Sequence, residues 1–391
     1  SAVPPSHMER LPDDPAQVGI TGGQASLFLA RDLLTDGREI VVKRSLCGTK
    51  DRIEQAELEV QILRKCHHPN IVKFHSAFSR PLEGVAGSSG GREVILAMEM
   101  CAGGNLLSYS QSRLASGKRL TELEIVQLFV QACRAVEHLH MLSPPVAHRD
   151  IKLENLLLGG DERKVVKLCD LGSATTRRSR ATTKEERAAL EADVERFTTP
   201  AYRAPELVDL FARKLVSEQV DVWSLGCVLY ALAYNTHAFT ENLAILNGKF
   251  SLPETPFYSA EFKALFGWMF DVEPTTRPRI GDVVDELDEL LGNRIKVYAR
   301  DRGSGRGERS FYKIMAKHER SAAQATSPRA SSASSSTLAA AGANAITAGA
   351  AVVASNPFDD SSLVASSPLA SPTAASASSA AGITTARASP T

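Results

Sequence analysis

The spacing of hydrophobic positions changes partway along the chain. Between residues 16 and 100, short apolar or β-branched runs predominate, as in SLFLA, EIVVKR, IVKFHSAF and EVILAMEM, and such runs are typical of strands. One stretch, DRIEQAELEVQILRKC, instead carries Ala56, Val60 and Leu63 at helical spacing. From residue 120 onward, long helical patterns take over, in ELEIVQLFVQACRAVEHLHML and SEQVDVWSLGCVLYALAY. The pattern predicts an α+β fold with a small sheet-rich lobe followed by a larger helical lobe.

The two ends of the chain lack this periodicity. Residues 1–12 form a polar, proline-rich segment without the apolar centre of a signal peptide, and we expect a flexible leader. Residues 293–320 are basic, which favours a solvated connector. Residues 321–391 are rich in Ala and Ser and would bury too little apolar area to offset their ordering entropy, so we expect a disordered tail. The folded region is expected to span residues 13–292, with the sheet-rich lobe at 13–100 and the helical lobe at 101–292.

Charge and composition exclude several classes of function. Lys plus Arg and Asp plus Glu both count 45, which gives a net charge of +0, whereas nucleic-acid binding needs a basic excess. The six cysteines form no C-x-x-C pair and are interpreted as reduced thiols of an intracellular protein. The long uncharged stretch at 338–354 is mostly alanine, too weakly apolar to predict a transmembrane segment. A membrane anchor in the tail remains a minor alternative.

Two short motifs carry side chains suited to phosphoryl transfer. That reaction requires a base for the hydroxyl proton, oxygen ligands for metal ions and cations that hold the phosphates. HRDIKLENLLL supplies Asp150, Lys152 and Asn155 within one loop, and KLCDLGSA supplies Asp170. Upstream, EIVVKR places Lys43 on a predicted strand. These residues form the candidate catalytic centre.

The order and spacing of these motifs, followed downstream by TTPAYRAPE, resemble the protein kinase family. The resemblance covers about residues 16–290 and implies a bilobal kinase fold, with a β-rich N-lobe and a helical C-lobe. The lysine in HRDIKLEN resembles serine/threonine kinases rather than tyrosine kinases. The resemblance therefore implies transfer of the ATP γ-phosphate to Ser and Thr hydroxyls of protein substrates, with ATP and Mg²⁺ as cofactors.

The resemblance also assigns a role to each residue of the centre. Asp150 would accept the proton of the substrate hydroxyl, and Lys152 would neutralise charge on the γ-phosphate. Asn155 and Asp170 would bind Mg²⁺ through oxygen, as a hard cation prefers. Lys43 would hold the α- and β-phosphates.

The nucleotide pocket is assigned in the same way. Glu59 on the predicted helix is the expected partner of Lys43, and Met98 stands where kinases guard the back of the adenine pocket. Glu99 to Cys101 would form the hinge, with Cys101 interpreted as a small hinge residue rather than a reactive thiol. The other expected nucleotide contacts are Ile20, Gly22, Ala25, Leu27, Val41 and Leu157.

Five further residues are expected to support the fold around this centre. Glu206 should pair with Arg277 as a buried ion pair, whose loss would leave a costly lone charge. Asp221 should cap the backbone of the catalytic loop. Leu63 and Leu171 should belong to an apolar column that links the lobes.

The phosphate-covering loop departs from the family pattern G-x-G-x-x-G. In ITGGQASL only the middle glycine is kept, at Gly22, while Ile20 and Ala25 replace the other two. Gly22 still lets the backbone approach a phosphate without a Cβ clash. The departure motivates an alternative function, a catalytically weak pseudokinase scaffold that binds endocytic partners.

Within the family, the chain is most similar to the Numb-associated and actin-regulating kinases, which include cyclin-G-associated kinase. The shared features are CDLGSAT, TTPAYRAPE, the C-x-G-G after the hinge and a loop of the x-x-G-G-x-A kind. These kinases have an extra helix in the activation segment and are often active without phosphorylation there; here KEERAALEADVERF predicts that helix. Thr198 and Thr199 fit a substrate-docking strand better than a phosphorylation site.

One aromatic residue stands in the tail after residue 320, within SNPFDD. Asn356 and Pro357 favour a turn, and Phe358 has no core to serve, so it is free to enter a pocket of another protein. Because the resemblance points to clathrin-mediated endocytosis, we expect this turn to bind an EH-domain protein. The implied substrates are endocytic adaptor or actin-patch proteins, and the implied location is the cytoplasm, with recruitment to endocytic sites at the plasma membrane.

Overall fold

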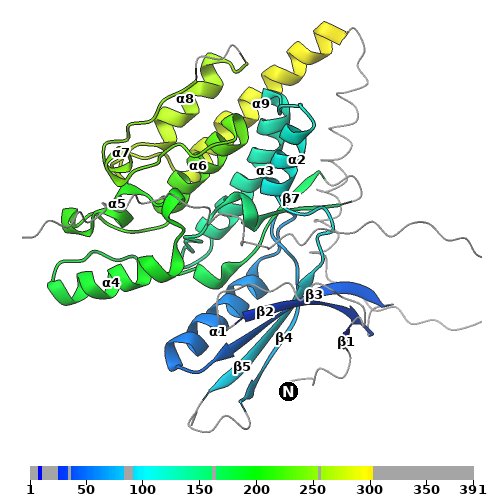
Figure 1. Cartoon of the computed structure of the whole chain (residues 1–391), viewed down its shortest axis with the longest axis vertical. Coiled ribbons are helices and arrows are strands. Elements are labelled where there is room, and N and C mark those ends of the chain that lie inside the picture. Colours follow the sequence, from blue (N-terminus) through cyan, green and yellow to red (C-terminus); the bar gives the residue numbers. More distant parts are fainter. Residues whose placement is uncertain are drawn as a thin grey trace, which may run out of the picture.

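The computed structural model describes residues 8–10, 25–33, 37–82, 91–160, 164–253 and 257–302. Two lobes are evident: a five-stranded antiparallel sheet with one helix, and a larger lobe built of helices (Figure 1). The bilobal fold predicted from the sequence is therefore confirmed. The 321–391 tail and the Asn356–Phe358 turn lie outside the described residues, as does the long uncharged stretch of the tail.

The N-lobe sheet has the strand order β1-β2-β3-β5-β4, and helix α1 packs against β3, β4 and β5. Its elements are β1 (Met8–Arg10), β2 (Ala25–Asp32), β3 (Arg38–Cys47), α1 (Lys50–Lys65), β4 (Phe74–Pro81) and β5 (Arg92–Glu99).

The C-lobe contains eight α-helices, a small two-stranded sheet and short 3₁₀ turns within the described residues. The α-helices and strands are α2 (Leu106–Ala115), α3 (Glu122–His140), β6 (Leu156–Gly159), β7 (Val165–Leu168), α4 (Lys184–Phe197), α5 (Pro205–Val208), α6 (Gln219–Tyr234), α7 (Asn242–Leu246), α8 (Ala260–Met269) and α9 (Ile280–Arg302). The turns are η2 (Leu153–Asn155), η3 (Leu171–Ser173), η4 (Pro200–Tyr202) and η5 (Leu210–Ala212).

Alternation along β3 sends its side chains to two different faces of the sheet. Ile40 and Val42 are buried in a small cluster with residues of β2 and β5, on one face. Val41 packs instead against the main core, which continues from the N-lobe into the C-lobe. Lys43 shares the face of Val41, so the fold turns this lysine toward the junction of the two lobes. Leu63 and Leu171 both belong to that main core, as predicted.

Helix α6 is the centre of the C-lobe. Every residue from Val220 to Ala233 is buried, which is the pattern of a helix surrounded by protein on all sides. Trp223 on this helix stacks on Phe239, with ring centroids 5.1 Å apart. In the part of the chain that the structure describes, no helix combines the length and apolarity that a bilayer crossing demands.

Helix α4 occupies the same residues as the helical run predicted for the activation segment. Thr183 caps its N-terminus: the hydroxyl of Thr183 accepts from the Glu186 amide at 3.1 Å, and the Glu186 carboxylate accepts from the Thr183 amide at 3.1 Å. This reciprocal capping satisfies two amides that a helix start otherwise leaves unpaired. The helix is therefore encoded locally.

Two expected boundaries differ from the structure. Met8–Arg10, expected in a flexible leader, forms β1 and pairs with Ala30 to Asp32 of β2, which gives that edge backbone partners. Helix α9 continues to Arg302, past the expected domain end at residue 292, into the segment expected to be a connector. Gly292 keeps a helical backbone there, instead of the left-handed conformation with which glycine ends many helices.

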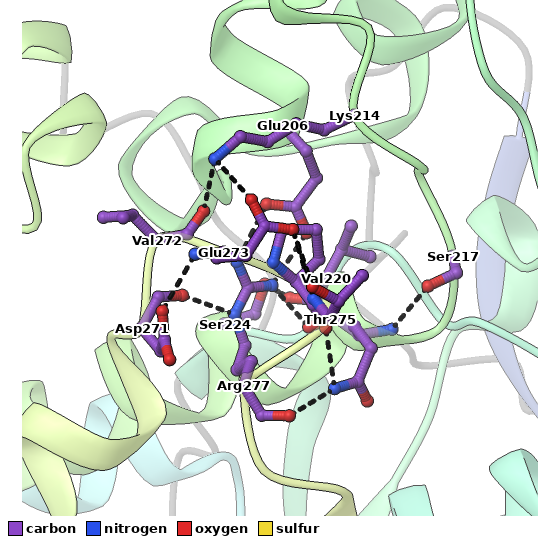
Figure 2. Close-up of polar contacts among 12 residues, drawn as sticks. Glu206, Lys214, Ser217, Val220, Ser224, Asp271, Val272, Glu273, Thr275 and Arg277 are labelled. Atoms are coloured by element: carbon purple, nitrogen blue, oxygen red, sulfur yellow. Dashed lines mark hydrogen bonds and ion pairs between the residues drawn. The ribbon is translucent and has the colours of Figure 1, made fainter.

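The predicted ion pair between Glu206 and Arg277 is confirmed (Figure 2). Two nearly parallel bonds join the guanidinium to the carboxylate, at 2.7 and 2.9 Å, and both side chains are fully buried. Arg277 also donates to the main-chain oxygens of Asp271 and Gln219 and lies over the ring of Trp223. The pair and these two further bonds thus tie α5, α6 and the loop before α9 together.

Replacing Arg277 with Met should destabilise the protein by about 3–5 kcal/mol, because the Glu206 carboxylate would be left buried without its counter-charge. Urea unfolding followed by circular dichroism measures this. The matched control is Arg134→Met, which removes a largely surface pair with Asp288 and should cost no more than about 1 kcal/mol. A cost for Arg277→Met as small as that of the control would show that the buried pair does not hold these elements together.

Candidate active site

The side chain of Lys43 joins three elements from both lobes. Its Nζ lies 2.8 Å from Glu59 Oε1 on α1 and 2.7 Å from Asp170 Oδ1, just before η3. Lys43 and Glu59 are almost fully buried, whereas the Asp170 side chain is 39% exposed. The predicted contact between Lys43 and Glu59 is therefore present, and Asp170 contacts the same lysine while part of its carboxylate stays exposed.

The charges of this cluster stabilise one another. Burial alone would lower the pKa of Lys43, but the carboxylates of Asp170 and Glu59 raise it above its ordinary value. The Lys43 ammonium lowers the pKa of Asp170 to about 2, against the opposing effect of burial. At neutral pH the cluster thus offers one ammonium and a charged, partly exposed carboxylate, the groups that phosphates and a hard cation would bind.

The catalytic loop brings Asp150, Lys152 and Asn155 together with a fourth residue, Thr199. The Thr199 hydroxyl donates to Asp150 Oδ1 at 2.6 Å, and Lys152 Nζ lies 3.3 Å from Asp150 Oδ2 and 3.2 Å from Thr199 Oγ1. Asn155 Nδ2 donates to the main-chain oxygen of Asp150 at 2.8 Å. Thr199 was expected in a docking strand, and its contact with Asp150 was not predicted, because the two residues are 49 positions apart.

Asp221 holds the backbone of the catalytic loop, as predicted. Its Oδ2 accepts from the His148 amide and its Oδ1 from the Arg149 amide, both at 2.8 Å. Arg149 has a φ of 68°, a conformation that a residue with a side chain adopts at a cost. The fully buried Asp221 carboxylate fixes that conformation and so sets the direction in which Asp150 leaves the loop.

Strand register brings several of the predicted nucleotide contacts to one place. Leu27 lies opposite Lys43 in the β2–β3 pair, and Val41 lies opposite Met98 in the β3–β5 pair. Ala25 lies at the start of β2, opposite Ser45. Ile20 and Gly22 lie outside the described residues.

The hinge follows directly after β5. Cys101 is buried, and this burial raises the pKa of its thiol to about 12, so the thiol is not activated. The carboxylate of Glu99 is engaged by Lys167 Nζ at 2.7 Å. A Cβ at Gly103 would lie 2.4 Å from the main-chain oxygen of Leu158, so glycine is required where the chain after the hinge crosses β6. Leu157, the neighbour of Leu158 on β6, is buried in the main core.

The residues proposed to bind metal fit a magnesium ion held together with phosphates. The bond from Asn155 Nδ2 to Asp150 directs the Asn155 amide oxygen away from Asp150, and the Cys169 amide donates to the Asn155 main-chain oxygen at 3.0 Å, which joins the segments of Asn155 and Asp170. Among the residues that the structure describes, no three His, Cys, Asp or Glu side chains converge as metal ligands. Two protein oxygens completed by phosphate oxygens are a usual environment for Mg²⁺.

The segment after Asp170 is held from both lobes. Gln55 on α1 donates from Nε2 to the main-chain oxygens of Gly172 at 2.8 Å and Ala174 at 3.1 Å. Arg149 donates from Nε to the main-chain oxygen between them, that of Ser173, at 2.7 Å.

Arg149 is anchored in turn by helix α4. Its guanidinium forms an ion pair with Asp193 and lies 5.1 Å from the centroid of the Phe197 ring. Neither Gln55 nor Asp193 was predicted from the sequence to contribute to the site. No local signal marks Gln55, because it bonds to main-chain oxygens, which every residue has.

Comparison with known proteins agrees with this geometry. The protein kinase domain model matches residues 17–287. Two probable serine/threonine-protein kinases of Dictyostelium discoideum are 34% identical over 283 residues and 35% identical over 274 residues, 71% and 70% of this chain. The serine/threonine-protein kinase ppk30 of Schizosaccharomyces pombe is 35% identical over 282 residues, 71% of this chain.

The chain spans only part of these curated relatives, 24%, 33% and 28% of their lengths in the same order. The matched region nevertheless includes both lobes and the motifs that carry Lys43, Asp150 and Asp170. The chain belongs to the protein kinase family.

Proposed function

We propose that this protein transfers the γ-phosphate of ATP to Ser and Thr hydroxyls of other proteins. The observation that carries the proposal is the hydroxyl of Thr199, which donates to Asp150 at 2.6 Å beside the ammonium of Lys152. An aliphatic hydroxyl thus already lies where a substrate hydroxyl would donate its proton to the base. A substrate Ser or Thr would take a similar position in front of the same carboxylate.

Each residue of the centre has a task in this reaction. Asp150 orients the substrate hydroxyl and accepts its proton as the oxygen attacks phosphorus. Lys152 and Lys43 hold phosphate oxygens and compensate the charge that develops on them. Asn155 and Asp170 would hold Mg²⁺, which when bound neutralises phosphate charge. Glu59 orients Lys43, and the surrounding burial excludes water that would otherwise screen these charges.

The alternative, a pseudokinase scaffold, is motivated by the loop around Gly22. Four residues weigh against it: Lys43, Asp150, Asn155 and Asp170, whose side chains lie in the arrangement just described. A scaffold without catalysis would have no need of a charged lysine buried between two carboxylates, since such a cluster is costly to form.

We further propose that the protein acts in clathrin-mediated endocytosis or on the actin cytoskeleton. The support is the similarity of CDLGSAT, TTPAYRAPE and C-x-G-G to the Numb-associated and actin-regulating kinases. Helix α4 adds to it, because that group has an extra activation-segment helix at this place. The substrates would be Thr-containing endocytic adaptor or actin-patch proteins, met in the cytoplasm at endocytic sites.

The Asp150→Asn variant should lose phosphate transfer by at least about a thousandfold, because the amide cannot accept the hydroxyl proton. Transfer to a recombinant adaptor fragment or a generic basic protein, measured with radiolabelled ATP, checks this. ATP with Mg²⁺ should still raise the melting temperature of the variant, because Lys43 and Asp170 are unchanged. If wild type and variant bound ATP equally and neither transferred phosphate, the pseudokinase alternative would hold instead.

The Phe358→Ala variant should lose binding to EH domains, because the turn at Asn356 and Pro357 would no longer present an aromatic side chain. Fluorescence anisotropy of a labelled tail peptide with a purified EH domain measures this. Leu363→Ala, a change to another apolar residue of the same tail, is the matched control and should bind like wild type. Equal binding of the Phe358→Ala peptide and the control peptide would rule out the proposed EH-domain site.

A further inference from the structure

Gln55 bonds to the segment that follows Asp170, one helical turn before Glu59 on the same face of α1. Its carboxamide nitrogen donates to two main-chain oxygens, those of Gly172 at 2.8 Å and Ala174 at 3.1 Å. Two residues four positions apart project from neighbouring points of one helix. Glu59 therefore contacts Lys43, while Gln55 contacts the backbone just after Asp170. One face of α1 thus holds both the lysine and the segment that follows Asp170.

The segment that Gln55 contacts is short and fixed at successive residues. Asp170 is bound by Lys43, and the Ser173 main-chain oxygen by Arg149 of the C-lobe. Ala147 and Thr175 exchange two backbone bonds, each of 2.9 Å. Gln55 supplies its bonds from the N-lobe, so α1 and the catalytic loop hold three consecutive carbonyls from opposite sides.

We propose that Gln55 is a positioning residue, which couples the placement of α1 to the conformation of the segment carrying Asp170. The inference rests on the proposed kinase function and goes beyond it by naming what holds α1 in place. When α1 lies against η3, Gln55, Glu59 and Lys43 all find their partners. When α1 moves away, the Gly172 and Ala174 oxygens lose their donor at the same time as Lys43 loses Glu59.

The coupling requires a donor at position 55, rather than only a side chain of that size. Gln55 is only partly buried, so its contribution to packing is modest, and an isosteric replacement separates the two roles. Gln55→Met keeps the length and the unbranched chain but removes both bonds. Gln55→Glu keeps the shape and directs a carboxylate at two carbonyl oxygens, which is repulsive. Gln61 lies on the exposed face of the same helix, so Gln61→Met is the matched control.

The test combines steady-state kinetics with hydrogen–deuterium exchange of the full chain. In Gln55→Met, kcat should fall about tenfold, the size expected when two neutral hydrogen bonds are lost from the active arrangement only. The KM for the protein substrate should stay within about twofold, because Gln55 is not part of the peptide-docking region. Gln55→Glu should be slower still, and Gln61→Met should match wild type.

Exchange gives a readout that does not depend on catalysis. The amides of Ala174, Thr175 and Ala147 should exchange faster in Gln55→Met than in wild type and in Gln61→Met. A kcat for Gln55→Met within twofold of wild type would overturn the proposal, and so would a loss of activity without faster exchange at these amides. An inactive wild type would instead refute the kinase function, while the exchange comparison would still decide whether Gln55 positions this segment.

Discussion

The contact of Lys43 with both Glu59 and Asp170 is the interaction on which the arrangement of the two lobes around the site depends. A lysine buried without a counter-charge would be strongly unfavourable, so its burial requires both carboxylates to stay close. Each of the three residues comes from a different element: a strand, a helix and the loop before η3. Satisfying one buried ammonium thus fixes the sheet, α1 and the loop of Asp170 relative to one another.

A second buried charge performs the corresponding task in the C-lobe. Asp221 lies near the start of α6, a largely buried helix. Its carboxylate accepts from two successive amides of the catalytic loop and contacts the ring of His140 at 2.9 Å. These bonds hold Arg149 in its left-handed conformation. The buried helix α6 therefore determines where Asp150 lies, without contacting the reacting atoms.

Much of this could be predicted from the sequence because the relevant signals are local or charged. The β-branched runs identified the strands, and helical spacing identified α1, α3 and α6. The helical run of the activation segment identified α4, whose first residues include the Glu186 that caps it with Thr183. The contacts of Lys43 with Glu59 and of Glu206 with Arg277 were also predicted, because the motifs that carry them resemble those of the protein kinase family.

What the sequence did not reveal depends on long-range or backbone partners. Met8–Arg10 forms β1 by pairing with Ala30 to Asp32 at the edge of β2. The residue types of β1 do not predict a strand by themselves. Thr199 reaches Asp150 across 49 residues, and Gln55 reaches main-chain oxygens across more than a hundred. Such contacts follow from the assembled fold, because neither residue type nor spacing distinguishes these side chains from ordinary polar residues on a turn or helix.

We propose that this assembled centre catalyses phosphate transfer to aliphatic hydroxyls. The most direct measurement is mass spectrometry of a degenerate library of Ser, Thr and Tyr peptides after incubation with the purified chain, ATP and Mg²⁺. Phosphate is expected on Ser and Thr peptides, none on Tyr peptides, and none on any peptide when EDTA removes the metal. Binding of ATP without phosphate on any peptide, or phosphate on tyrosine, would contradict this proposal.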